Sequence, residues 1–271
     1  MIRRRKRGLV PSTRKSAPRR RLPKIVNHPN PLVSIIIPAM NERTRLPAVL
    51  REAGRVHPCS ETIVVANGST DSTAEIAAAI GAKVLRYAEP LGHDVGRRIG
   101  AEAARGEVLL FIDADMIIPA ARLRPFVNAV LSGMDVALNG YSGPVNRTDA
   151  HPVVIAKHTL NAWLARPDLQ GGSLTAVPHA LSRRAVLAIG SKSLEVPPLA
   201  HTVAIVKGLD VRIADMVDVG RMNPVRKPFG GQDPLTSLVV GDHLEAIHWL
   251  IQERGQRGGY RDLGRLRSKV R

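Results

Sequence analysis

Short apolar runs alternate with amphipathic segments through the first half of the chain. The runs that have the length of buried strands lie at residues 33–37, 62–66, 83–85, 108–112 and 135–138. Segments with helical spacing of apolar residues lie between them, at residues 44–54, 72–80, 95–104 and 119–131. This alternation predicts an α/β domain with a mainly parallel sheet flanked by helices.

The second half of the chain is less regular. Residues 140–180 hold scattered Gly, Pro and His, which indicates loops and short helices. Helical spacing resumes over Leu181–Ile189 and again over Leu235–Gln252, whereas Val211–Val219 alternates like a strand with one polar face. We therefore expect one domain over residues 31–255, with a first half over 31–140 and a second half over 141–255.

Charge separates the two ends of the chain from this domain. Of the 40 Lys and Arg residues, 11 lie in residues 1–24, which hold no acidic residue. We predict a disordered basic arm over residues 1–30 and a basic flexible tail over 256–271. The arm can be a solvated tail, an anchor for an anionic membrane surface through residues 1–24, or a contact for nucleic acid.

Composition narrows the possible functions. Eight aromatic residues are too few for a surface that stacks bases, so nucleic acid is an unlikely partner. The one cysteine excludes an internal disulfide and a multi-cysteine zinc site. No apolar run approaches the roughly 18–20 residues that cross a bilayer. We expect a cytoplasmic protein, with peripheral binding at the inner face of the membrane as an option.

Polar residues follow three of the expected strands. These segments are Pro38–Glu42, Ala66–Asp71 and Asp113–Asp115. Ligands of open α/β sheets bind at the carboxyl ends of the strands. Two carboxylates separated by one residue after a buried strand are costly unless a cation lies between them. A divalent ion that also carries phosphate oxygens meets that need.

With these motifs the chain resembles the family 2 glycosyltransferases, which have the Rossmann-like GT-A fold. The residues that match the family's donor-binding motifs are Pro38, Ala39, Asn41, Glu42, Asn67, Gly68, Ser69, Asp71 and Arg97. The resemblance implies a nucleotide-diphosphate sugar as donor, either a UDP-sugar or a GDP-sugar, with Mg²⁺ or Mn²⁺ as cofactor. It assigns Asp115 as metal ligand and Asp113 as a contact to the metal or the donor ribose. Arg97 would border the diphosphate, and the acceptor is unspecified.

The resemblance also implies roles that this chain fills differently. Ala66 stands where the family has an acidic residue, and Val196-Pro197 stand where it has the Glu-Asp pair that contains the catalytic base. Glu195 is the nearest carboxylate and our candidate base, with Asp210 and Asp215 as weaker substitutes. Some GT-A enzymes use a C-terminal histidine as an additional metal ligand, and His243 is the candidate here.

These departures leave two functional hypotheses. The first is a metal-dependent glycosyltransferase that uses Glu195 as its base. The alternative is a sugar-nucleotide-binding protein that has lost catalysis and acts through partners or an anionic membrane surface. The absent Glu-Asp pair favours the alternative, whereas the intact Asp113-Ala-Asp115 motif favours the enzyme.

Overall fold

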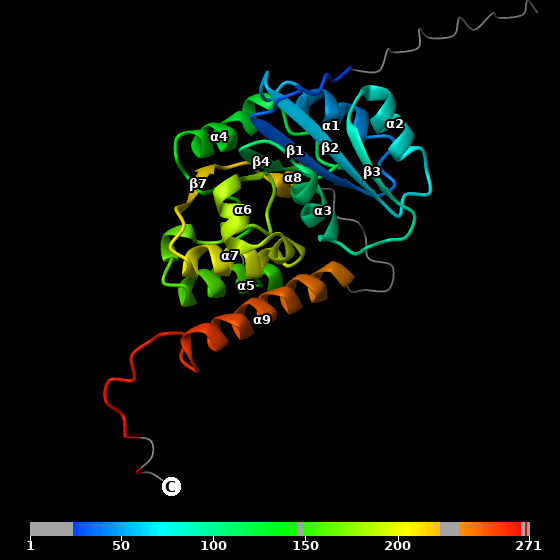
Figure 1. Cartoon of the computed structure of the whole chain (residues 1–271). Helices are drawn as coiled ribbons and strands as arrows, with labels where there is room; N and C mark the ends of the chain where they lie inside the picture. The colour runs from blue at the N-terminus through cyan, green and yellow to red at the C-terminus, as the bar shows by residue number, and fades with distance from the viewer. Residues whose placement is uncertain (1–23, 146–148, 223–232, 267–268, 270–271) are drawn as a thin grey trace, which may run out of the picture.

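A seven-stranded sheet forms the centre of the protein. The computed structural model describes residues 24–145, 149–222, 233–266 and 269, so the predicted basic arm lies outside the described residues up to residue 23. The strands are β1 (Val33–Ala39), β2 (Ser60–Asn67), β3 (Lys83–Tyr87), β4 (Val108–Phe111), β5 (Val136–Asn139), β6 (His179–Ser182) and β7 (Val211–Asp215). Their order is β3-β2-β1-β4-β6-β5-β7, and β6 alone among these seven runs antiparallel to its neighbours. The mainly parallel α/β sheet is confirmed (Figure 1).

Helices cover both faces of the sheet. One face packs against α1 (Leu46–Ala53), α2 (Thr73–Ile80) and α4 (Ala120–Leu131). The other packs against α3 (Val95–Ala103), α6 (Arg183–Ile189), the 3₁₀ helix η2 (Ser191–Glu195) and α7 (Pro197–Val206). Alternate residues of β1 point to the two faces, with Ile35 and Ile37 in one core and Ile36 in the other. A strand buried on both faces reads as a continuous apolar run, which is how β1 appears in the sequence.

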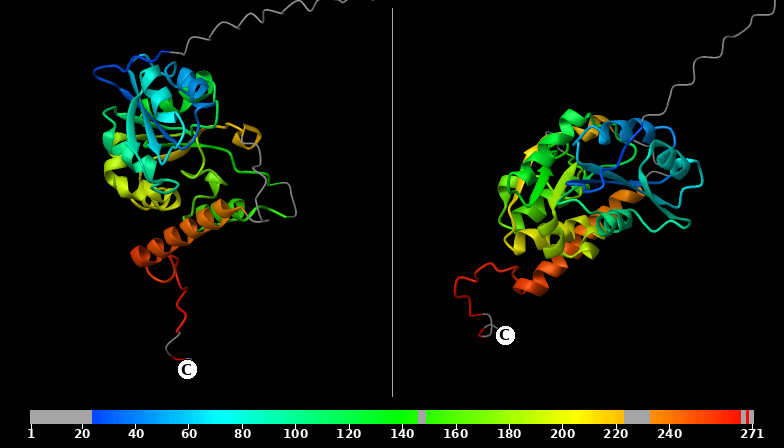
Figure 2. Two further views of the ribbon diagram at one scale, coloured as in Figure 1. Left: turned by 90° about the vertical axis from the view of Figure 1, so that its right-hand side faces the viewer. Right: turned by 45° about the horizontal axis from the view of Figure 1, so that its top comes forward.

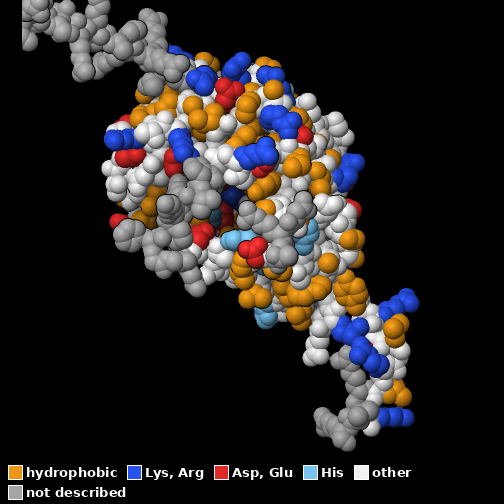
Figure 3. All heavy atoms as spheres, turned by 180° about the vertical axis from the view of Figure 1, so that it is seen from behind, with side chains coloured by type: hydrophobic (Ala, Val, Ile, Leu, Met, Phe, Trp, Pro, Cys, Tyr) orange, Lys and Arg blue, Asp and Glu red, His pale blue; other side chains and the backbone are white. Residues whose placement is uncertain are grey.

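Two further helices form an outer layer. Helices α5 (Pro152–Trp163) and α9 (Pro234–Arg254) pack on each other and on α7 through a small core that includes Leu160, Leu164 and Leu250. Figure 2 shows α9 in orange, lying below the sheet domain. From behind, acidic side chains and histidines gather around a hollow (Figure 3). None of the helices in the described ranges is long and apolar enough to cross a membrane.

The structure corrects several predictions for the second half. Residues 140–180 contain the 12-residue helix α5, the short 3₁₀ helix η1 (Pro167–Leu169) and the start of β6. The predicted helix from Leu181 begins only at Arg183, because Ala180 and Leu181 pair with β4 and β5. The predicted strand over 211–219 ends at Asp215, and the short helix α8 (Val219–Met222) follows it.

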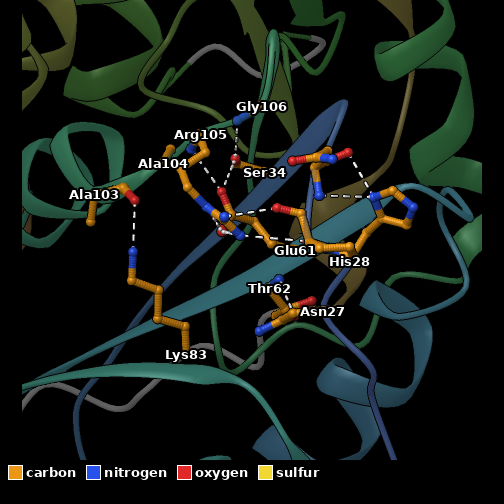
Figure 4. A network of polar contacts seen from close by, with 12 residues as sticks. Asn27, His28, Ser34, Glu61, Thr62, Lys83, Ala103, Ala104, Arg105 and Gly106 are labelled. Carbon is orange, nitrogen blue, oxygen red and sulfur yellow. Dashed lines mark hydrogen bonds and ion pairs between the residues drawn. The ribbon is translucent and has the colours of Figure 1, made fainter.

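The segment before β1 is also ordered earlier than predicted. Ile25 donates its backbone N–H to the carbonyl of Ile80, and the Asn27 side chain accepts from Thr62. The guanidinium of Arg105 donates to the carbonyl of Pro29 (2.9 Å) and pairs with the buried carboxylate of Glu61 (3.2 Å), as Figure 4 shows around Arg105. Residues 25, 27 and 29 of the predicted arm therefore contact the folded domain.

Candidate functional site

The predicted motifs meet at the carboxyl edge of the sheet. Along the chain, β2 and β3 lie on one side of β1, whereas β4 lies on its other side. The order of the strands therefore reverses between β1 and β4, and ligands of doubly wound sheets bind at such a point. Asn41 follows β1 and Asp113 follows β4 at this place.

The loops after β1 and β2 are tied to each other. The Asn41 side chain accepts a hydrogen bond from the backbone N–H of Thr70 (2.9 Å). Thr73 lies at the start of α2 and accepts from the backbone N–H of Glu42 (2.8 Å). Asp71 accepts from the backbone N–H of Thr73 (2.9 Å) and from its hydroxyl, which together lower the pKa of Asp71. Asn41 and Asp71 thus shape the two loops.

Asn67 and Gly68 position the loop that leads to α3. The Asn67 amide donates to the carbonyl of Gly92 (2.9 Å) and accepts from the N–H of Leu91 (2.6 Å). Gly68 has a φ of 64°, and a Cβ there would lie 2.8 Å from Pro90. Only glycine adopts that conformation readily and leaves space for the proline. Asn67 and Gly68, which are predicted to bind the sugar donor, therefore hold the loop 88–94 against the end of β2.

Two glycines allow α3 to approach β1 closely. A Cβ at Gly96 would lie 3.0 Å from Pro38, and one at Gly100 would lie 2.3 Å from Ile36. Because α3 lies so close to β1, Arg97 in the first turn of α3 reaches the ends of the strands. Arg97 is buried, and its guanidinium lies 3.1 Å from Asp94, 3.8 Å from Asp113 and 3.2 Å from the carbonyl of Leu174.

Asp113 lies in an environment that disfavours its charge. Burial raises the pKa of Asp113, and the neighbouring carboxylates of Asp115 and Asp94 raise this pKa further, against the opposite effect of Arg97. Asp115 lies in the same turn, where its carbonyl accepts from Arg45 (2.9 Å). A cation beside Asp113 and Asp115 would offset this repulsion, and carboxylate oxygens are ligands that Mg²⁺ and Mn²⁺ prefer.

The carboxylates do not form a complete set of metal ligands. No three His, Cys, Asp or Glu side chains in the described parts of the chain gather as a site for a metal ion. Mg²⁺ is often bound by one or two carboxylates together with substrate phosphates, so Asp113 and Asp115 fit an ion that reaches the site with a diphosphate. This chemistry fits the predicted cofactor, with the remaining ligands supplied by the donor.

His243, the predicted additional metal ligand, lies in the outer helical layer, and its role as a ligand stays a prediction. It lies within α9 and is 1% exposed, and its Nδ1 donates to the carbonyl of Val239 (2.7 Å). Burial lowers the pKa of His243, and Lys157 of α5 contributes to that shift. The ring therefore faces the interior of the outer helical layer.

Glu195 lies at the end of η2 and makes an ion pair. Its carboxylate lies 2.9 Å from the guanidinium of Arg98, which also pairs with Glu102 at 2.8 Å. Arg97 and Arg98 are consecutive and so leave α3 about 100° apart, since a helix has 3.6 residues per turn. Arg97 faces Asp113, whereas Arg98 faces η2. Glu195 as general base stays a prediction.

Three charged residues of this edge were not predicted from the sequence. Arg45 binds the turn of Asp115, and Asp94 binds Arg97. Asp242 of α9 has a pKa raised to about 6, mainly by burial and further by the charges of Asp94 and Glu245. Only the position of Asp94, directly before the Val95-Gly96-Arg97 segment, could have indicated from the sequence that Asp94 belongs to the site.

Known proteins are similar in sequence to part of this chain. The dolichyl-phosphate beta-glucosyltransferase of Drosophila melanogaster is 37% identical over 109 residues, which cover 34% of this chain and 33% of that protein. The 4,4'-diaponeurosporenoate glycosyltransferase of Staphylococcus haemolyticus is 37% identical over 90 residues, which cover 31% of this chain and 24% of that protein. The chain thus spans a third or less of the length of these two relatives.

Solved structures share the fold, and a family model covers the site. Glucosyl-3-phosphoglycerate synthase from Mycobacterium tuberculosis, solved with Mn²⁺, UDP and phosphoglyceric acid, superimposes with a TM-score of 0.59 at 20% identity, over 86% of this chain and 81% of that chain. The sequence model of glycosyl transferase family 2 matches residues 34–175, which include Arg97, Asp113 and Asp115. The chain belongs to glycosyl transferase family 2.

Proposed function

We propose that the protein transfers a sugar from a nucleoside-diphosphate sugar with the assistance of a divalent metal ion. The observation that carries this proposal is the pair Asp113 and Asp115 beside the buried Arg97 at the switch point of the sheet. UDP-glucose is the first donor to test, because a structurally similar synthase was solved with Mn²⁺ and UDP-glucose. GDP-sugars are the second class of donor.

In sugar transfer, charge develops at a position where the residues at this edge of the sheet can balance it. Sugar transfer passes through an oxocarbenium-like transition state, and the departing nucleoside diphosphate gains negative charge. When bound, Mg²⁺ or Mn²⁺ supplies Lewis-acid stabilisation of that charge. Asp113 and Asp115 would hold the ion, and Arg97 would keep Asp113 in place while adding fixed positive charge.

A carboxylate base completes the proposal. Glu195 would take the proton of the acceptor hydroxyl, a step to which a positioned base contributes about 10²–10⁴-fold. In the structure its carboxylate pairs with Arg98 at 2.9 Å. The same ion pair must open, or turn toward the acceptor, for the proton to move.

A second candidate is a protein that binds sugar nucleotides without turnover. It is favoured by the Val196-Pro197 sequence at the position of the family's acid pair and by the engagement of Glu195 with Arg98. Both candidates require the donor site, and they differ only in whether a sugar leaves the nucleotide.

Two measurements separate the candidates. A thermal-shift screen of UDP- and GDP-sugars, with and without Mn²⁺, identifies the donor, and release of the nucleoside diphosphate then measures turnover. Glu195→Gln should lower turnover about 100-fold or more without changing donor affinity. Glu102→Gln is the matched control, because it removes the other carboxylate partner of Arg98. Equal loss in both variants would contradict the role of Glu195, and a wild-type protein that binds donor without turnover would establish the second candidate.

A further inference from the structure

Large apolar side chains are exposed at the end of α5 and in the chain that follows α9. Trp163 ends α5 and is 46% exposed, and Tyr260 beyond α9 is 49% exposed. Leu263 and Leu266 follow along the chain and are 92% and 64% exposed. We call these four residues, with the arginines described below, the C-terminal face.

The part of this segment around Tyr260 contacts the outer helical layer, and the chain beyond it runs away from the domain (Figure 1). The Tyr260 hydroxyl donates to the backbone carbonyls of Ala162 (3.0 Å) and Trp163 (3.1 Å), so it anchors this part of the chain to the end of α5. The backbone near Gly258 lies over Leu250 of α9. The aromatic part of the face therefore has a defined position on the fold.

Basic residues alternate along the chain with the exposed apolar residues after α9. Between residues 253 and 269, the described chain carries five basic residues, Arg254, Arg257, Arg261, Arg265 and Lys269, against the two acidic residues Glu253 and Asp262. Asp262 pairs with Arg257 (3.4 Å) and Arg265 (2.6 Å). A shallow hollow in this segment is lined by Arg254, Arg257 and Tyr260 among others. Figure 3 shows basic and hydrophobic side chains together on the part of the molecule that extends downward.

We propose that the C-terminal face docks the protein onto an anionic bilayer surface. Trp and Tyr favour the level of the lipid headgroups, and exposed leucines enter the boundary with the acyl chains. Arginines beside them attract anionic lipids. An anionic bilayer can bury the exposed leucines in its boundary region while its headgroups attract the basic residues that lie beside them in the chain. This proposal does not rest on the proposed sugar transfer.

Vesicle flotation with the full chain tests the proposal. The vesicles are phosphatidylcholine alone, or phosphatidylcholine mixed with phosphatidylglycerol, and neither contains a sugar acceptor. The double variant Leu263→Ser/Leu266→Ser should lower partitioning onto the mixed vesicles about tenfold or more, because it removes apolar area that the bilayer buries. Leu187→Ser is the matched control, since Leu187 is 75% exposed on α6, away from this face.

The charge contribution has its own variant pair. Arg261→Gln/Arg265→Gln should weaken binding to the mixed vesicles about fivefold for each arginine removed, the equivalent of about 1 kcal/mol each. It should leave binding to phosphatidylcholine vesicles unchanged. Arg51→Gln/Arg55→Gln, at the exposed end of α1, removes the same charge elsewhere and should have a smaller effect.

Three results would overturn the proposal. The first is a wild-type protein that does not float with mixed vesicles. The second is unchanged binding of the leucine variant together with loss of binding on deletion of residues 1–24, which would assign docking to the arm. The third is a leucine variant that changes from dimer to monomer in sedimentation while it still binds vesicles, which would make the face a self-association surface. Thermal melts of each variant confirm that the fold is retained.

Discussion

Replacing Arg97 with methionine should destabilise the protein severely. The guanidinium of Arg97 is buried between Asp94, Asp113 and the carbonyl of Leu174. Removing one partner of a buried ion pair costs about 3–5 kcal/mol, because the remaining carboxylate is left without compensation. Asp94 is itself 7% exposed, so water cannot take the place of the arginine. We expect a loss in this range from the free energy of unfolding, measured by urea denaturation at neutral pH.

The neighbouring arginine supplies the control. Arg98 also pairs with two carboxylates, but its side chain is 38% exposed. Exposed pairs contribute about 1 kcal/mol or less, so Arg98→Met should cost far less than Arg97→Met. Equal losses in the two variants would refute the reasoning that burial of the Arg97 cluster sets its energy.

The pH dependence of the Arg97 variant gives a second check. Asp113 has a raised pKa in the folded protein, and Arg97 opposes this rise. Without Arg97 the folded state binds a proton at Asp113 more tightly than the unfolded state does, so acid favours folding at this group. The stability difference between wild type and Arg97→Met should therefore narrow as the pH falls from about 7 to about 5. A difference that widens over this range would contradict the placement of Asp113.

Two further predictions concern stability. Burial lowers the pKa values of His179 and His201 to about 3, against about 6.5 in an unfolded chain, so their contribution is complete above about pH 6.5 and is lost as the pH falls toward 3. The free energy of unfolding, measured by urea denaturation from pH 8 to 4, should fall over that window by up to about 1.4 kcal/mol per pH unit for each histidine, and a flat profile would contradict this expectation. Gly100→Ala should cost about 1–3 kcal/mol through overpacking against Ile36. The control Gly241→Ala in α9, where no atom lies within 4 Å of the added Cβ, should be neutral or stabilising by up to about 1 kcal/mol, and equal effects would contradict the close approach of α3.

The first half of the fold could be predicted because its signals are local. Strand β1 and helix α3 each show their type within their own residues, and the structure places them within a residue or two of the predicted bounds. Strand β6 could not be predicted in this way, because its four residues are defined by pairing with β4 and β5, far apart in the chain. The order of residues 24–30 could not be predicted either, because their contacts with Ile80, Thr62 and Arg105 join segments that are far apart in the sequence.

The sequence could predict which residues lie at the candidate site better than it could predict which neighbours they contact. The sequence places Asp113 and Arg97 correctly at one edge, because both follow from the strand–helix order. The surroundings of His243 could not be predicted, because a helical pattern does not show which neighbours a side chain meets, and here these include Lys157. The role of Asn41 and Asp71 in joining two loops appears only once both loops are seen together.

The central claim is that Asp113 and Asp115 form a metal-dependent site for a nucleoside diphosphate. Isothermal titration of UDP into wild type and Asp115→Asn, in Mn²⁺ and in EDTA, tests it most directly, with Asp168→Asn of the exposed Arg166 pair as control. The account predicts binding by wild type and the control in Mn²⁺, with binding lost in EDTA and in Asp115→Asn. Equal affinity of Asp115→Asn and wild type in Mn²⁺ would contradict it.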